Sequence, residues 1–158
     1  MLIYYRLPGL SAALALIIFA LFNFALYKLI PVTMTLPAIT GFLISIGTAV
    51  DGNILIFERL KEELRGGKRI NQAVNAGFNR AWTSIRDSNL STLIICAVLY
   101  GFGTSFGAGA VRGFAVTLAL GLTINLFTAV IVTRTLLYFL MLPMNQETIS
   151  KRPWLMGL

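Results

Sequence analysis

Four long apolar stretches, separated by short or charged segments, dominate the pattern of hydrophobic and polar positions along the chain. They cover residues 10–29, 36–57, 90–106 and 114–142. Each is long enough to cross roughly 30 Å of hydrocarbon as a helix, which takes about 17–25 residues. A secretory signal peptide, the alternative for the first stretch, has a shorter apolar region of about 7–15 residues. The pattern therefore predicts an all-α membrane protein, a bundle of four transmembrane helices.

The connections between these stretches differ in length. Residues 30–35 and 107–111 form two short connections, so each joins neighbouring antiparallel helices into a hairpin. Residues 58–89 form a long and charged connection between the two hairpins. The chain accordingly divides into a first hairpin over 10–57, a connection over 58–89 and a second hairpin over 90–142, flanked by residues 1–9 and a tail over 143–158.

The distribution of charge indicates which helix ends face the cytoplasm. The chain has 13 Lys and Arg against 6 Asp and Glu, a formal net charge of +7. Ten of the basic residues fall in the long connection or the two terminal segments, whereas the opposite side has only Lys28 and Arg112. The positive-inside rule therefore predicts a cytoplasmic N-terminus, connection and C-terminus. No basic run is interleaved with aromatic residues, so we expect no nucleic-acid partner.

The long connection has an amphipathic second half. Gly66 and Gly67 separate a short charged helix over 58–65 from a second predicted helix. Apolar residues recur in that second helix at three- and four-residue spacing. They are Ile70, Val74, Phe78, Ala81, Trp82 and Ile85. The spacing predicts a cytoplasmic amphipathic helix lying in the membrane interface, with Trp82 at headgroup depth. Packing of this helix on another cytoplasmic domain is the alternative.

The composition excludes several kinds of chemistry. The chain has no His and a single Cys, so zinc fingers, Cys/His nucleophile pairs and intrachain disulfides are excluded. The sequence Gly66-Gly67-Lys68 lacks the first glycine and the preceding strand of a phosphate-binding loop. We therefore expect no enzyme, no metal and no organic cofactor. Any work would draw on a transmembrane ion gradient, which supplies about 2.3 kcal/mol per charge per 100 mV.

Asp51 is the carboxylate that the second apolar stretch contains. It lies 15 residues after Leu36, which puts it about 22 Å along the crossing, in the cytoplasmic half. Ionisable residues inside the membrane face the bundle interior or a water-filled cavity and mark ion pathways. We therefore predict that Asp51 loads and releases protons. A purely structural role, with Asp51 held by a hydrogen bond or an Arg elsewhere in an assembly, is the alternative.

Other small and polar residues surround this stretch. The spacing of Gly41, Ser45 and Ala49 predicts a close approach of another helix. Asp87, at the start of the third span, suits a helix N-cap. Amides and hydroxyls in spans more often join helices than bind a transported ion. The candidate supporting residues for Asp51 are Asn53, Asp87, Asn89 and Thr92.

Three blocks of the sequence are similar to those of a known family. They are residues 47–64 (GTAVDGNILIFERLKEEL), residues 87–94 (DSNLSTLI), and residues 112–118 (RGFAVTL) with 127–134 (FTAVIVTR). In this order, they resemble the SecD branch of the SecD/SecF family of protein-export membrane proteins, within the resistance-nodulation-division superfamily. The SecF branch also has an Asp in the equivalent span, but a different sequence follows it.

The resemblance implies a function and partners. It implies a multi-pass protein of the bacterial or archaeal cytoplasmic membrane that helps to draw secreted polypeptides out of the SecYEG translocon, using the proton-motive force. A SecF-like subunit would be the partner, and Asp51 matches the family's proton-coupling Asp. The family also has a span, a large periplasmic head and a second span before the part that matches. Residues 1–9 look like the cytoplasmic end of that second span, so we expect a fragment that needs the head to handle polypeptide.

Two other functions and the choice of ion stay open. One alternative is half of a proton-driven transporter of the same superfamily that exports small molecules or lipids. The other is a passive scaffold that docks a partner through Phe78 and Trp82, in which case Asp51 would tolerate replacement by Asn. A single carboxylate with neighbouring hydroxyls and amides is compatible with protons or sodium ions.

Overall fold

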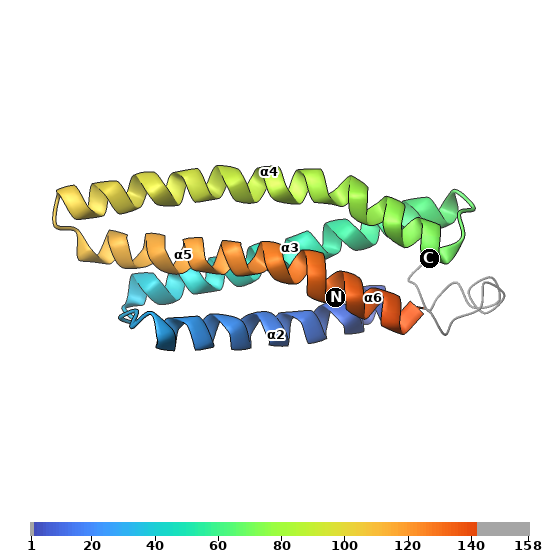
Figure 1. The fold of residues 1–158 in the computed structure, drawn as a ribbon, viewed down its shortest axis with the longest axis horizontal. Coiled ribbons are helices and arrows are strands. Elements are labelled where there is room, and N and C mark those ends of the chain that lie inside the picture. Colours follow the sequence, from blue (N-terminus) through green and yellow to red (C-terminus); the bar gives the residue numbers. More distant parts are fainter. Residues whose placement is uncertain (1, 142–158) are drawn as a thin grey trace.

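The computed structural model describes residues 2–141, and these are helical apart from short turns (Figure 1). The elements are α1 (Leu2–Tyr5), α2 (Leu7–Leu29), α3 (Leu36–Arg65), α4 (Ile70–Ser105), α5 (Gly109–Phe127), the π-helical turn η1 (Thr128–Thr133) and α6 (Arg134–Met141). Four helical stretches are long and apolar enough to cross a membrane, Pro8–Leu29, Leu36–Arg65, Ile70–Ser105 and Gly109–Leu140. The predicted all-α fold with four spans is confirmed. The predicted tail over 143–158 lies outside the described residues.

Local sequence signals explain where the helices of the first hairpin begin and where α3 ends. A proline occupies the first turn of both α2 and α3, where no backbone N–H is needed. Thr35 caps α3, and its Oγ1 accepts a hydrogen bond from the Ala38 N–H at 3.3 Å. At the other end of α3, Gly67 has a φ of 80°, which glycine adopts without strain. The α3–α4 turn therefore falls where the glycine pair predicts it.

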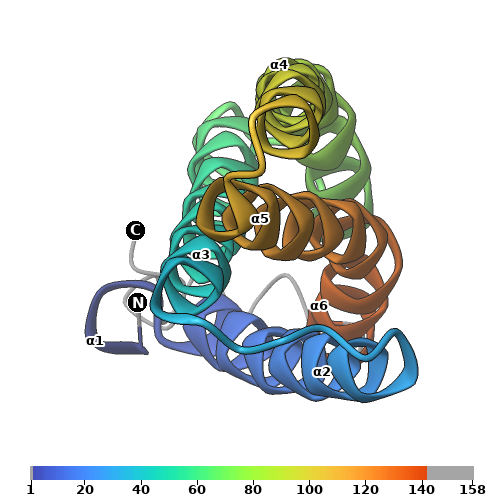
Figure 2. The same ribbon diagram turned by 90° about the vertical axis from the view of Figure 1, so that its left-hand side faces the viewer.

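Helix α5 lies in the middle of the bundle, between α4 and α2, with α3 beside it (Figure 2). The small residues of α3 make the contact with α5 close. A Cβ on Gly41 would lie 2.8 Å from the carbonyl oxygen of Phe114. A Cβ on Gly121 would overlap the side chain of Ser45. The predicted close approach of another helix to Gly41 and Ser45 is confirmed.

The α3–α4 hairpin is longer than a bilayer crossing. Helix α3 has 30 residues and α4 has 36, which correspond to about 45 Å and 54 Å against roughly 30 Å of hydrocarbon. The last part of α3 and the first part of α4 pack tightly, because a Cβ on Gly77 would lie 2.8 Å from the backbone nitrogen of Leu60. The buried residues of this contact include Phe57, Leu60, Val74, Phe78, Ala81 and Ile85.

This packing changes the interpretation of the amphipathic segment. Residues 70–85 are helical, but they form the first part of α4 rather than a separate interfacial helix. The expectation of a separate helix was wrong because no glycine or proline interrupts the chain between Phe78 and Ser91. The apolar side of the segment packs on α3, so Phe78 is buried and unavailable to a docking partner. Trp82 is half-buried.

Ion pairs join α3 and α4 near the turn that connects them. The buried Glu63 carboxylate contacts the Lys68 ammonium at 2.5 Å and the Arg80 guanidinium at 2.8 Å. Hydrogen bonds from these two groups hold the pKa of Glu63 below its ordinary value of 4.5. The pKa of Glu63 is lower in the folded protein than in the unfolded chain. The ion pairs therefore stabilise the fold fully at pH values above the pKa that Glu63 has in the unfolded chain. This stabilisation is lost as the pH falls through the folded-state pKa.

We therefore expect Glu63→Gln to lower the melting temperature of the detergent-solubilised protein at pH 7. The difference from the wild type should shrink as the pH is lowered from 7 toward 3 (about one unit or more below the ordinary pKa), because the ion pairs stabilise the fold less as the pH falls below the unfolded-state pKa of Glu63. Asp87→Asn is the matched control, since Asp87 and its partner Arg86 are both exposed and such pairs contribute little. A melting-temperature difference that is the same at both pH values would contradict the assignment.

Candidate functional site

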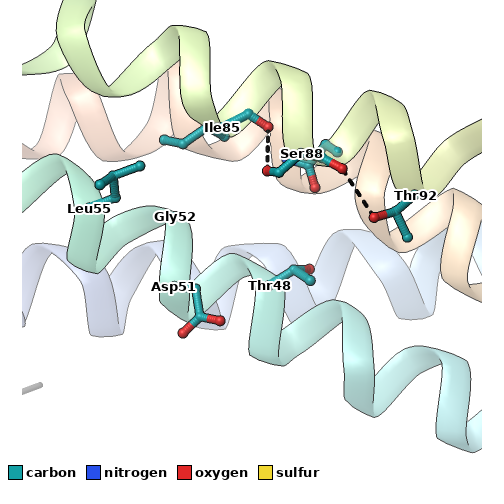
Figure 3. Close-up of a pocket in the computed structure, with 8 residues that line it drawn as sticks. Thr48, Asp51, Gly52, Leu55, Ile85, Ser88 and Thr92 are labelled. Atoms are coloured by element: carbon teal, nitrogen blue, oxygen red, sulfur yellow. Dashed lines mark hydrogen bonds between the residues drawn. The ribbon is translucent and has the colours of Figure 1, made fainter.

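Asp51 lines a groove between α3 and α4. The groove has a volume of about 240 Å³ and opens to the outside of the bundle. Helix α3 contributes hydroxyl, carboxylate and apolar groups, and α4 contributes two hydroxyls, one amide and one apolar side chain (Figure 3). The lining residues are Thr48, Asp51, Gly52 and Leu55 from α3, with Ile85, Ser88, Asn89 and Thr92 from α4.

The Asp51 side chain is exposed and has neither a hydrogen bond nor an ion pair with any residue in the described range 2–141. Its carboxylate points away from Ser88 and Thr92 (Figure 3). The other carboxylates in this range all have a basic partner within 4 Å; these are Glu58, Glu62, Glu63 and Asp87. The sequence predicts that Asp51 faces either the bundle interior or a water-filled cavity. In the structure its side chain does not face the interior of this bundle and lines a groove that opens outward.

The groove includes two of the four predicted supporting residues. Asn89 is buried and Thr92 is half-buried, and both face the groove from α4. The hydroxyls of Thr48 and Ser88 also line the groove, and they were not among the predicted residues. Their signal is helical spacing, because Thr48 lies three residues before Asp51 and Ser88 lies four residues before Thr92.

The other two predicted supporting residues lie elsewhere. Asn53 is buried on the inner side of α3, where its Oδ1 accepts a hydrogen bond from the Thr133 hydroxyl at 2.9 Å. Asp87 is not a helix cap, because it lies in the middle of the continuous helix α4. Its exposed carboxylate accepts a hydrogen bond from the Arg86 side chain at 2.9 Å, away from the groove.

The hydroxyls of the groove already donate within their own helices. Thr48 donates to the Ser45 carbonyl at 2.8 Å, Ser88 to Ile85 at 3.1 Å and Thr92 to Ser88 at 3.1 Å. Their oxygen lone pairs are left as acceptors for groups that enter the groove. Within residues 2–141, no cluster of His, Cys, Asp or Glu could hold a metal ion. The groove therefore offers one titratable carboxyl beside neutral oxygen acceptors, which suits a proton or a small cation.

Comparison with known proteins identifies the family. Residues 1–142 match the family model for the C-terminal part of the protein export membrane proteins SecD and SecF. The chain is 59% identical over 137 residues to the protein translocase subunit SecD of Thermobaculum terrenum, covering 87% of this chain and 27% of the relative. It is 53% identical over 142 residues to the same subunit of Synechocystis, covering 90% of this chain and 29% of that relative.

A solved structure has the same fold. The crystal structure of SecDF from Thermus thermophilus, described as a translocon-associated membrane protein, superimposes with a TM-score of 0.84 at 40% identity. The match covers 90% of this chain and 19% of that one. The chain spans under a third of the length of the curated relatives that it matches. It belongs to the SecD/SecF family of protein-export membrane proteins and corresponds to the C-terminal membrane region of SecD.

Proposed function

We propose that this chain is the membrane part of a subunit that assists polypeptide translocation across the cytoplasmic membrane, and that Asp51 couples this work to an ion gradient. The observation that carries the proposal is the Asp51 carboxylate itself. It lies within a membrane-spanning helix, faces outward beside the polar residues of α4, and has no ion pair among the described residues. The family of the chain and the translocase subunits among its relatives support the translocation role.

The environment of Asp51 supports a second membrane subunit as a partner. A charged carboxylate in direct contact with lipid costs at least about 2.5 kcal/mol. This cost is avoided when another protein surface or water covers the groove between α3 and α4. We propose that a SecF-like subunit packs against this face and supplies the groups that complete the ion pathway. The ion is a proton or sodium, since the oxygen acceptors of the groove suit either.

The remaining partners and the orientation follow from the same proposal. The SecYEG translocon would deliver the exported polypeptide, and a periplasmic head outside this chain would bind it. The N-terminus, the α3–α4 turn and the C-terminus would lie in the cytoplasm, because Arg65, Lys68 and Arg69 gather at that turn. The chain would then be a multi-pass subunit that works as a translocation motor and not as an enzyme.

The proposal predicts which substrate accumulates when the subunit is lost. In cells from which the complete gene is deleted, we expect unprocessed precursors of secreted proteins to accumulate, and the complete wild-type gene to reverse this. The measurement is pulse-labelling of a secreted protein, with drug and lipid export assayed in the same strain. Normal secretion together with a loss of drug or lipid export would contradict the proposal and favour an efflux transporter.

A further inference from the structure

A buried hydrogen bond joins the Asp51-bearing helix to the fourth span. The Thr133 hydroxyl donates to Asn53 Oδ1 at 2.9 Å, and the two residues are 1% and 4% exposed. Other hydrogen bonds join side chains of different helices within residues 2–141, but they are only partly buried or exposed. Breaking the Asn53–Thr133 bond would leave two polar groups without partners in the bundle interior, which is unfavourable.

The bond lies where the fourth span changes its helix type. Thr133 is the last residue of η1, the π-helical turn between α5 and α6. Single π-helical turns inside longer helices are rare and occur frequently at functional sites. They are also among the few places where a long helix bends sharply. The α6 segment can therefore change its angle relative to α5 at η1 without breaking the rest of the span.

Asn53 and Asp51 lie on opposite sides of the same turn of α3. They are two residues apart, which corresponds to about 200° around the helix. Asp51 accordingly lines the outer groove while Asn53 points into the bundle. A rotation or tilt of this turn that follows a change of charge at Asp51 must move Asn53 as well. The Thr133 hydroxyl either follows Asn53 or loses its acceptor.

The start of α6 is also joined to α4. Arg134, the residue after Thr133, donates to Asn75 Oδ1 at 2.8 Å, and its guanidinium lies 5.5 Å from the centre of the Phe78 ring. Phe78 is buried against α3 in the cytoplasmic part of the hairpin. Two consecutive residues thus connect α6 to α3 and to α4, directly after the turn at which the span can bend.

We propose that Asn53 and Thr133 are positioning residues, which transmit the position of the Asp51-bearing turn of α3 to α6 while η1 acts as the hinge. This inference rests on the proposed function, because Asp51 must first respond to the gradient. The pair has two arrangements, bonded and broken, and the burial of both partners makes the broken one unfavourable. A two-state contact of this kind is the element through which a site can bias a distant segment.

Four variants of the complete protein test the inference in membrane vesicles that contain the assembled complex, and one of them is Asp51→Asn, which tests the proposed function. Thr133→Val removes the hydroxyl with little change of shape, and Thr133→Ser keeps it. Thr123→Val is the matched control, because the exposed Thr123 hydroxyl donates only to the Ala119 carbonyl of its own helix. The release of an exported polypeptide is measured with the gradient present and after an uncoupler has collapsed it.

We expect Thr133→Val to reduce gradient-dependent release about fivefold, which corresponds to ~1 kcal/mol, the size of a single net hydrogen bond. Release without the gradient and the amount of assembled complex should stay at the wild-type level. Thr133→Ser should restore gradient-dependent release, and Thr123→Val should leave it unchanged. These results together would support the role of the pair in transmission.

Other results would overturn the inference in distinguishable ways. Normal release by Thr133→Val, while Asp51→Asn abolishes the gradient-dependent part, would reject the positioning role and leave the proposed function intact. If Asp51→Asn has no effect, the proposed function fails and the inference fails with it. A parallel loss of assembled complex and of gradient-independent release in Thr133→Val would show that the bond only holds the fold together. Loss of gradient-dependent release in Thr133→Ser would show that the Thr133 methyl group matters and not the hydroxyl.

Discussion

Replacing Gly121 with alanine is expected to destabilise the protein by up to about 3 kcal/mol, the upper part of the usual range for an overpacked core. The added Cβ would overlap the Cβ and Oγ of Ser45, which is itself fully buried on α3. Neither helix can withdraw easily, because Gly41, one turn before Ser45, also approaches the Phe114 carbonyl of α5 closely. The measurement is the free energy of unfolding of the complete protein in detergent micelles, from a denaturant titration.

Two further variants separate this contact from a general effect of alanine. Gly101→Ala should be neutral or slightly stabilising, because no heavy atom lies within 4 Å of a Cβ at that position and alanine is the better helix former. Ser45→Gly combined with Gly121→Ala should recover much of the lost stability, since it removes the overlapping atoms. A Gly121→Ala protein as stable as the wild type would contradict the α3–α5 packing.

The four spans and the α3–α5 contact could be predicted because their signals are local in the sequence. Hydropathy over about 20 residues determines a span, and Gly41, Ser45 and Ala49 recur every four residues on one face of α3. The continuity of α4 was missed because Asp87 and Ser88 also form a plausible helix cap. In the structure Ser88 bonds to the Ile85 carbonyl inside the helix, and the packing of α4 on α3 favours one uninterrupted helix.

The candidate site could be predicted in part. A carboxylate inside an apolar stretch identifies Asp51, and the polar residues at the start of the third span include Asn89 and Thr92. Helical spacing also puts Asn53 on the side opposite to Asp51, but it does not determine which side faces the bundle. Tertiary packing decides that point, and it turns Asp51 outward. No residue pattern in Thr128–Thr133 predicts a π-helical turn, so η1 needed the structure.

Asp51→Asn is expected to remove the gradient-dependent part of polypeptide release. Asparagine has nearly the same shape as aspartate, but it has no carboxyl group to bind and release a proton. Because Asp51 has no ion pair or hydrogen bond within residues 2–141, its replacement breaks no such bond between the described helices. Folding and assembly should therefore be retained. Asp87→Asn is the matched control, since it removes a carboxylate outside the groove and should leave release unchanged.

The decisive experiment on Asp51 places Asp51→Asn in the complete protein. It follows the release of an exported polypeptide from membrane vesicles with the ion gradient present and after its collapse, and it quantifies the assembled complex in the same vesicles. We predict a normal amount of complex and release that no longer responds to the gradient. Gradient-dependent release at the wild-type level, or loss of the complex, would contradict the assignment of Asp51 as the ion-coupling carboxyl and would make its role structural.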